Sequence, residues 1–319
     1  MAKPPDMLPV PDLAKVGQRS PWLFRAAVVV LIGLSLLVVI ERNRIRAYWW
    51  AWQLTRTDDA AAQAYYVGSL SAVGDAATDA VERLARDERP EIRSLSIIVL
   101  ARLPHGGGVN GLGTLLGDRD QDVAESAALS LAFIEGGAAA GQAQRLLIDA
   151  VASDDSRRAC AAAAALSRVN SEPAIVALAN AARRHAEPLV RAQAIESLAA
   201  SLGAGRMTRQ PLPPPTAECD PLGVLVAALS DEGTFTGGLS LERQMASASG
   251  FAGARTGVPM PATEPATLSA GRTVGDVAAE NLARLTGQPI EPRETWTPEE
   301  QAQVLKQCRE ALGGQKDKG

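Results

Sequence analysis

Residues 87–103 read DERPEIRSLSIIVLARL, a short helical phrase in which Ile92, Ser96, Leu100 and Leu103 follow one another at helical spacing. The same phrase returns three more times before residue 203, and the first positions are separated by 31, 35 and 32 residues. The later copies carry Val123, Ala127, Leu131 and Ile134; Arg158, Ala162, Leu166 and Val169; and Val190, Ala194, Leu198 and Ser201. A period of this length is typical of helical repeats, in which each helix pair buries its apolar stripe against its neighbours.

The composition favours an all-α fold. Of the 319 residues 46% are hydrophobic but only 4% are aromatic, so the core must consist of Ala, Leu and Val in closely approaching helices. The net charge of −4 provides no broad basic surface, and we therefore expect no binding to nucleic acid. Cys160, Cys219 and Cys308 lack C-x-x-C spacing, which argues against a disulfide framework and against a zinc site.

An apolar run from Trp22 to Ile40 predicts a single transmembrane helix. At about 1.5 Å per residue the run would extend roughly 28 Å, close to the thickness of the hydrocarbon layer. Arg25 is its only charge, and half of the chain's aromatic residues lie at its ends. The run continues into Glu41-Arg42-Asn43-Arg44 without a small-x-small cleavage pattern, so an uncleaved anchor in the cell membrane is favoured over a signal peptide.

The flanks of this run leave two questions open. Basic residues lie on both sides of it, so the side of the membrane that the repeats face is not decided. The basic and aromatic segment 41–57 either continues the helix out of the bilayer and lies against anionic lipid, or serves only as the stop signal for the span.

Proline and glycine set the other boundaries. The proline-rich residues 1–21 are expected to be a disordered tail, and repeats are expected over 58–202. A proline-rich linker over 203–221 would then break the array, and a partner helix is expected over 222–230. Residues 231–271 are rich in Gly, Ala, Ser, Thr and Pro and predict a long loop or disordered insertion.

The C-terminal segment 272–319 returns to the repeat pattern. It carries a fifth copy of the phrase at Val274, Ala278, Leu282 and Leu285. Beyond it, Thr297-Pro298-Glu299-Glu300 has the form of a capping box with proline at the first helical position. The helix that follows is expected to close the end of the array.

Three loop-to-helix segments resemble HEAT repeats, in particular the short bacterial kind similar to those of phycobilin lyases. They are Asp87-Glu88-Arg89-Pro90-Glu91-Ile92-Arg93, Asp118-Arg119-Asp120-Gln121-Asp122-Val123 and Glu187-Pro188-Leu189-Val190-Arg191. The resemblance covers residues 60–202 and implies an α-solenoid of helix pairs. The third copy departs from the pattern at Arg158, where an apolar residue is expected, so its register stays open.

Motifs for catalysis and for metal binding are scarce. His105 and His185 lie outside any H-E-x-x-H pattern, and the chain lacks the His-Glu dipeptide through which di-iron HEAT proteins hold metal. Gly106–Gly111 matches G-x-G-x-x-G, but it follows a helix instead of a strand and therefore predicts a turn. We expect no catalytic residue, no cofactor and no metal.

A surface remains as the candidate site. The second helices of stacked pairs line the concave side, and the residue after the first core position is expected to point partly outward. The predicted protein-binding face contains Glu91, Arg93, Arg102, Asp122, Glu125, Arg157, Arg168, Arg191 and Glu196. The sequence thus predicts a membrane-anchored, non-enzymatic HEAT-repeat scaffold with a protein partner. The alternatives are a chromophore lyase-like or isomerase-like protein, which the resemblance implies, and a structural spacer at the membrane.

Overall fold

The computed structural model describes residues 21–169, 171–207, 220–236, 239, 272–290, 293 and 295–313. In this part of the chain the elements are helices, apart from one short two-stranded ladder, so the fold is all-α. The α-helices are α1 (Pro21–Leu54), α2 (Ala60–Val73), α3 (Thr78–Leu84), α4 (Pro90–Leu100), α5 (Val109–Leu115), α6 (Gln121–Ala132), α7 (Gly137–Val151), α8 (Ser156–Leu166), α9 (Glu172–Arg184), α10 (Pro188–Met207), α11 (Pro221–Ala227), α13 (Val274–Thr286) and α14 (Pro298–Gly313). Short 3-10 helices are η2 (Gly74–Ala77), η3 (Pro104–Gly106) and η4 (Ala228–Ser230).

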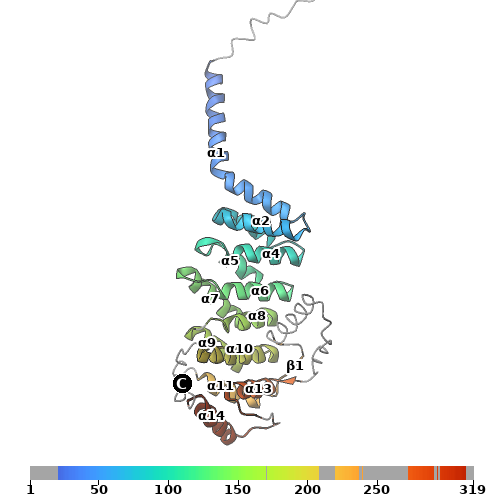
Figure 1. Cartoon of the computed structure of the whole chain (residues 1–319), viewed down its shortest axis with the longest axis vertical. Helices are drawn as coiled ribbons and strands as arrows, with labels where there is room; N and C mark the ends of the chain where they lie inside the picture. The colour runs from blue at the N-terminus through green and yellow to red at the C-terminus, as the bar shows by residue number, and fades with distance from the viewer. Residues whose placement is uncertain are drawn as a thin grey trace, which may run out of the picture.

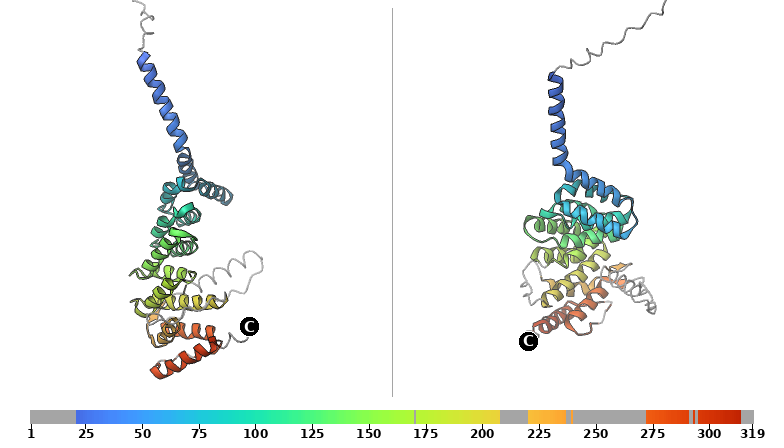
Figure 2. Two further views of the ribbon diagram at one scale, coloured as in Figure 1. Left: turned by 90° about the vertical axis from the view of Figure 1, so that its left-hand side faces the viewer. Right: turned by 45° about the horizontal axis from the view of Figure 1, so that its top comes forward.

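The helices stack in two rows along an elongated molecule (Figures 1 and 2). The second-helix row consists of α2, α4, α6, α8, α10 and α13, each in contact with the next. The first-helix row contains α5, α7, α9, α11 and α14, again in contact in this order. Helices α3 and α4, α5 and α6, α7 and α8, and α9 and α10 form the pairs between the rows.

The repeated phrase forms the core of the second-helix row. Its second and third positions are buried in all five copies, including Ala162 and Leu166 of the third copy and Ala278 and Leu282 of the fifth. Arg158, the irregular first position of the third copy, is half-buried on α8, and its Nε atom has no hydrogen-bond partner. The third copy therefore keeps the register of the others despite this arginine.

Two glycines are required where backbones approach closely. A Cβ atom on Gly108, at the start of α5, would lie 2.1 Å from the carbonyl oxygen of Leu100 in α4. A Cβ atom on Gly275, in the first turn of α13, would lie 2.8 Å from the carbonyl oxygen of Leu229. Both distances are below van der Waals contact, so a side chain at either position would push neighbouring turns of the stack apart.

The N-terminal helix has two different parts. Its N-terminal part projects from the stack, as Figure 1 shows, and the side chains of 28–32 are exposed. Its C-terminal part packs against α2 and α3 and buries Ala47, Ala51 and Leu54. Segment 41–57, predicted to lie outside the repeats, thus supplies the first helix of the array. The sequence did not reveal this packing, because aromatic and basic residues lie between the three buried apolar positions.

Within the described part of the chain, no helix combines the length and the apolarity needed to cross a bilayer. The side chains of residues 33–40 are not among those that the structure describes.

The break in the array begins later than the sequence predicts. Helix α10 continues to Met207, beyond the predicted linker start at 203, because glycine lowers helix stability without forbidding a helix. Residues 208–219 of the predicted linker and most of the predicted insertion 231–271 lie outside the described residues, as does the predicted tail up to residue 20. Strands β1 (Thr234–Phe235) and β2 (Arg272–Thr273) pair antiparallel at the two ends of that insertion, an element the sequence did not reveal.

The C-terminal helices begin at reciprocal caps. In α14 the Thr297 backbone N–H donates to the Glu300 carboxylate at 2.9 Å and the Glu300 N–H donates to Thr297 Oγ1 at 3.3 Å, which confirms the predicted capping box. Thr273 and Asp276 form a second box at the start of α13. Helix α14 packs on α11 and α13, and burial raises the pKa of its Cys308 thiol.

Neighbouring isoleucines of α4 test the packing of the rows. Ile97 is 3% exposed and Ile98 is 41% exposed. We expect Ile97→Ala to lower the free energy of unfolding by about 2–5 kcal/mol because it leaves a cavity, and Ile98→Ala to lower it by less than about 1 kcal/mol. Urea unfolding of both variants, followed by circular dichroism, measures the difference. Equal losses would contradict this packing of α4.

Candidate functional site

The exposed sides of α4, α6 and α8 form a continuous surface, which we call the second-helix face. Equivalent positions of the three repeats lie side by side because these helices stack directly on one another. Glu91, Asp122 and Arg157 lie at the N-terminal ends of the helices and are exposed. Arg102 and Arg168, just beyond the C-terminal ends of α4 and α8, are also exposed. The structure therefore brings together five of the predicted face residues, and half-buried Glu125 lies among them.

Between these charged ends the surface also exposes apolar groups, beside polar ones such as Ser126. Ile98 on α4 is aligned with half-buried Leu129 on α6 and Ala164 on α8. Phe133, at the C-terminal cap of α6, is 66% exposed and occupies the position equivalent to Arg102 and Arg168. The second-helix face thus exposes Ile98 near its centre and Phe133 in its C-terminal margin, and its margins carry both signs of charge.

A groove of about 530 Å³ adjoins this face at Phe133. It lies between the turn that follows α4 and the turn that joins α6 to α7, and His105 and Glu135 are the ionisable residues in its lining. His105 adopts a left-handed backbone conformation (φ 54°), and Gly136 and Gly137 also have positive φ. The predicted glycine turn 106–111 contributes one wall, so the structure places it in a turn and at the start of α5.

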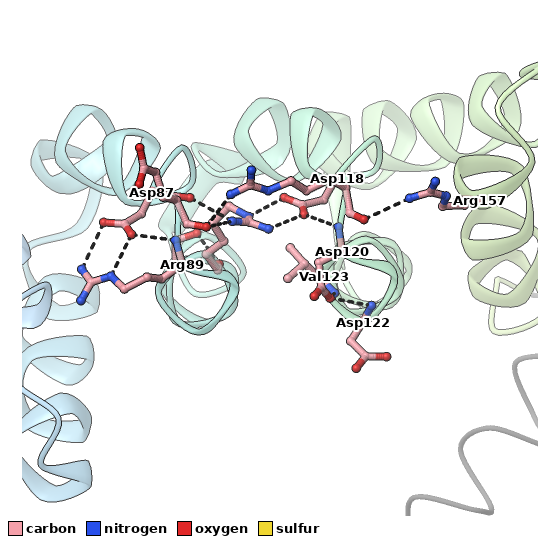
Figure 3. A network of polar contacts seen from close by, with 11 residues as sticks. Asp87, Arg89, Asp118, Asp120, Asp122, Val123 and Arg157 are labelled. Atoms are coloured by element: carbon pink, nitrogen blue, oxygen red, sulfur yellow. Dashed lines mark hydrogen bonds and ion pairs between the residues drawn. The ribbon is translucent and has the colours of Figure 1, made fainter.

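Helix caps fix the charged margin of α6 and α8. Asp120 Oδ1 accepts from the backbone N–H groups of Asp122 and Val123 at 3.0 and 3.2 Å (Figure 3). Asp155 Oδ1 accepts in the same way from the N–H groups of Arg157 and Arg158 at 3.1 and 3.4 Å. Each cap satisfies backbone donors that the first helical turn leaves free and so fixes where the margin begins.

Arg93 does not belong to the exposed face. It is 4% exposed, and its guanidinium donates to both carboxylate oxygens of Asp118 at 2.7 Å. Its Nη1 atom also donates to the carbonyl oxygens of Asp87 and Glu88 at 3.0 and 2.9 Å. The prediction that Arg93 points outward is wrong, because the position after the first core residue faces the loop of the next repeat.

Arg191 makes the same set of contacts three repeats later. Its guanidinium donates to Asp231 at 2.6 and 2.8 Å and to the carbonyl oxygens of His185 and Ala186 at 2.9 and 3.0 Å. The hydrogen bonds with Asp231 raise the pKa of Arg191, as those with Asp118 raise the pKa of Arg93. Both arginines join consecutive repeats and are not available to a partner. Ala124, Ala159 and Gly275, at the equivalent positions, are also buried.

Glu196 is the second predicted face residue that the structure buries. It is 5% exposed on α10 and accepts a hydrogen bond from Gln193 at 3.0 Å. The side chains of 192–199 are all buried, so α10 lacks the exposed stripe of α4 and α6. Helical spacing predicts which side of α10 carries Glu196, but it does not predict that this side is buried.

Further contacts join the loops of consecutive repeats, including those where alanine stands at the position of Arg93. Arg119 donates to the carbonyl oxygen of Glu88 at 2.5 Å, and Arg157 donates to that of Arg119 at 3.1 Å. His185 Nε2 lies 3.0 Å from the carbonyl oxygen of Ser153. Together with Arg93 and Arg191, these contacts form a loop ladder from residue 87 to residue 231; Figure 3 shows its beginning, from Asp87 to Arg157.

The sequence did not predict the loop ladder because the two partners of each contact belong to different repeats. Asp87 and Arg93 are separated by the same interval as His185 and Arg191, but the carboxylates that bind the arginines belong to the following repeat. The carboxylate of Asp87 has a different partner: Arg89 binds it at 3.1 Å, and this contact lowers the pKa of Asp87.

No group of three or more His, Cys, Asp or Glu side chains in the described residues is placed to hold a metal ion.

No protein-family model matches the chain, and no curated protein matches it. One similar solved structure is the crystal structure of an engineered protein, with 19% sequence identity over 84% of this chain and 68% of that chain. Its TM-score is 0.31, too low to support any conclusion about the present chain.

Removing the buried arginine tests whether the loop ladder stabilises the stack. Arg93→Met leaves the buried carboxylate of Asp118 without its partner, so we expect the free energy of unfolding to fall by about 3–5 kcal/mol. Arg102→Met, a matched change at an exposed arginine, should alter it by less than about 0.5 kcal/mol. Combining Arg93→Met with Asp118→Leu should recover part of the loss because the uncompensated charge is gone. Urea unfolding measures all three; similar values for the two single variants would argue against a structural role.

Proposed function

We propose that this chain is a non-enzymatic scaffold that binds a protein partner through the second-helix face. The observation that carries this proposal is the exposure of Ile98 and Phe133 on one surface that also carries exposed charges of both signs. Protein interfaces commonly have an apolar centre surrounded by a polar rim, and stacked repeats commonly bind through extended surfaces of this kind. The groove beside Phe133 extends the same surface and offers a recess for an anchoring side chain.

The repeats themselves are proposed to be HEAT-like. The stacked helix pairs and the intervals of 31, 35 and 32 residues between copies support this assignment. So does the recurrence of one loop-to-helix pattern in which an arginine of one repeat binds an aspartate of the next.

We further propose that the N-terminal part of α1 inserts into the cell membrane and holds the array there. The exposed side chains of Val28 to Ile32 and the direction of this part away from the stack support the proposal. An apolar helix that projects into water gains free energy by entering a hydrocarbon layer. The basic residues on both sides of the run favour neither orientation.

Site-specific photo-crosslinking tests the protein-binding proposal. A photoreactive amino acid at Ile98 or Phe133 should give discrete crosslinked species in cells because these positions lie at the proposed interface. The same group at Arg145 or Asp149, exposed on α7 in the first-helix row, is the matched control and should give none. Mass spectrometry of the crosslinked species identifies the partner. Equal crosslinking from both rows, or none from Ile98 and Phe133, would contradict the proposed site.

Flotation with lipid vesicles tests membrane insertion. The full chain should float with vesicles, whereas a Val29→Asp and Leu31→Asp double variant should stay at the bottom of the gradient. Each carboxylate near the centre of a span costs about 3 kcal/mol. Ile98→Asp, a similar change outside α1, should leave flotation unchanged, and circular dichroism should show all variants equally helical. A wild-type chain that fails to float disproves the anchor.

A further inference from the structure

The exposed side of the C-terminal part of α1 combines aromatic and basic residues. Ile45, Trp49 and Trp52 are 52%, 51% and 46% exposed. Arg42 and Arg46 lie among them at helical spacing, Arg56 follows in the turn after α1, and all three are exposed. The opposite side of the same helix carries Ala47, Ala51 and Leu54, which pack on the stack. The aromatic and basic side therefore faces away from the repeats. We call it the aromatic-basic face.

Helix α2 extends this face. Tyr66 lies edge-on to Trp49 with ring centroids 6.3 Å apart, and Tyr65 lies edge-on to Tyr66 at 5.5 Å. Tyr65 is itself 64% exposed. The guanidinium of Arg56 lies over the ring of Trp52 at 4.1 Å. The rings of Trp49, Tyr66 and Tyr65 thus form a connected aromatic surface across α1 and α2.

The charge of the aromatic-basic face is not neutralised within the described residues. No ion pair joins Arg42, Arg46 or Arg56 to a described acidic side chain, whereas Glu41 and Asp79 are both paired with Arg44. Asp59, the nearest acidic cap, accepts from the N–H groups of Ala61 and Ala62 at the start of α2. Three arginines with exposed indole rings are complementary to a surface that is anionic and partly apolar.

The position of the face points to one such surface. Figure 1 shows that α1 changes direction where it reaches the stack, so its C-terminal part runs across the end of the stack. The projecting apolar part leaves from that same end (Figure 2). If the projecting part enters a bilayer, the aromatic-basic face is brought to the headgroup layer, where tryptophan and tyrosine side chains are most stable.

We propose that the aromatic-basic face docks on anionic lipid headgroups and so orients the array relative to the membrane. This inference rests on the proposed insertion of α1, and it adds a lipid class and a second contact to it. The arginines select anionic lipid, and the rings enter the interfacial layer. The repeats then extend away from the bilayer.

Tryptophan quenching by lipid tests the docking. The full chain is reconstituted in phosphatidylcholine vesicles with and without phosphatidylserine, each containing phosphatidylcholine brominated near the headgroup. The quenching lost in a Trp49→Phe and Trp52→Phe double variant reports the depth of these two rings. We expect this quenching to be strong with phosphatidylserine, weak without it, and reduced by high salt.

Charge variants separate docking from anchoring. Each basic residue near an anionic surface strengthens binding roughly fivefold, so the Arg42→Gln, Arg46→Gln and Arg56→Gln triple variant should lose most of the phosphatidylserine-dependent quenching. Arg145→Gln, Arg183→Gln and Arg184→Gln, at three exposed arginines of the first-helix row, form the matched control and should keep it. Both triple variants should float as the wild type does.

Each outcome decides between the two proposals. Chains that float but show no quenching of Trp49 and Trp52 overturn the docking and leave the anchor standing. Chains that float only with phosphatidylserine, with both rings quenched, support the docking and overturn the anchor. Absence of flotation with either vesicle overturns both, and equal quenching in the two vesicle types overturns the selection of anionic lipid.

Discussion

Every helix pair in this chain depends on its neighbours for the burial of its small apolar side chains. The α8 helix illustrates this constraint, because Ala161, Ala162, Ala163 and Ala165 are all buried although none of these side chains can fill much space. Such a helix is stabilised only when adjacent backbones come close enough to exclude water. Close approach explains the glycines at 108 and 275, where a methyl group would already meet a carbonyl oxygen.

The same constraint determines the ends of the molecule and the loops. The C-terminal part of α1 covers the first repeat and α14 covers the last, so neither terminal pair exposes a full apolar side. Along one edge, buried Arg93 and half-buried Arg191 fix the spacing of consecutive loops through bidentate contacts with Asp118 and Asp231. Bidentate geometry tolerates little displacement, so these pairs set the relative position of repeats more sharply than apolar contacts do. Only sides that neither row covers, such as the second-helix face, remain for binding.

Much of the array could be predicted from sequence because its signal is periodic. The spacing of Ala127 and Leu131 and of their equivalents identified the core of each second helix, and the Thr297 capping box located the start of α14. The candidate face was only partly predictable. Helical periodicity predicts only roughly which way a side chain points. Arg93 is next to a core position, at the border between the buried and the exposed sides of α4. Whether it is buried therefore depends on whether the next loop offers an acceptor. The burial of Glu196 and the β1–β2 pairing depend on segments distant in sequence, for which local pattern carries no information.

The β1–β2 ladder has a consequence for the evolution of the chain. Thr234 is paired with Thr273, so the backbone leaves the array and re-enters it at one point. The residues between these strands can therefore vary in number without changing the distance that the stack must span, since the ladder fixes that distance. This point is a natural acceptor position at which insertion of a second domain, by recombination or by design, would leave the pitch of the repeats unchanged.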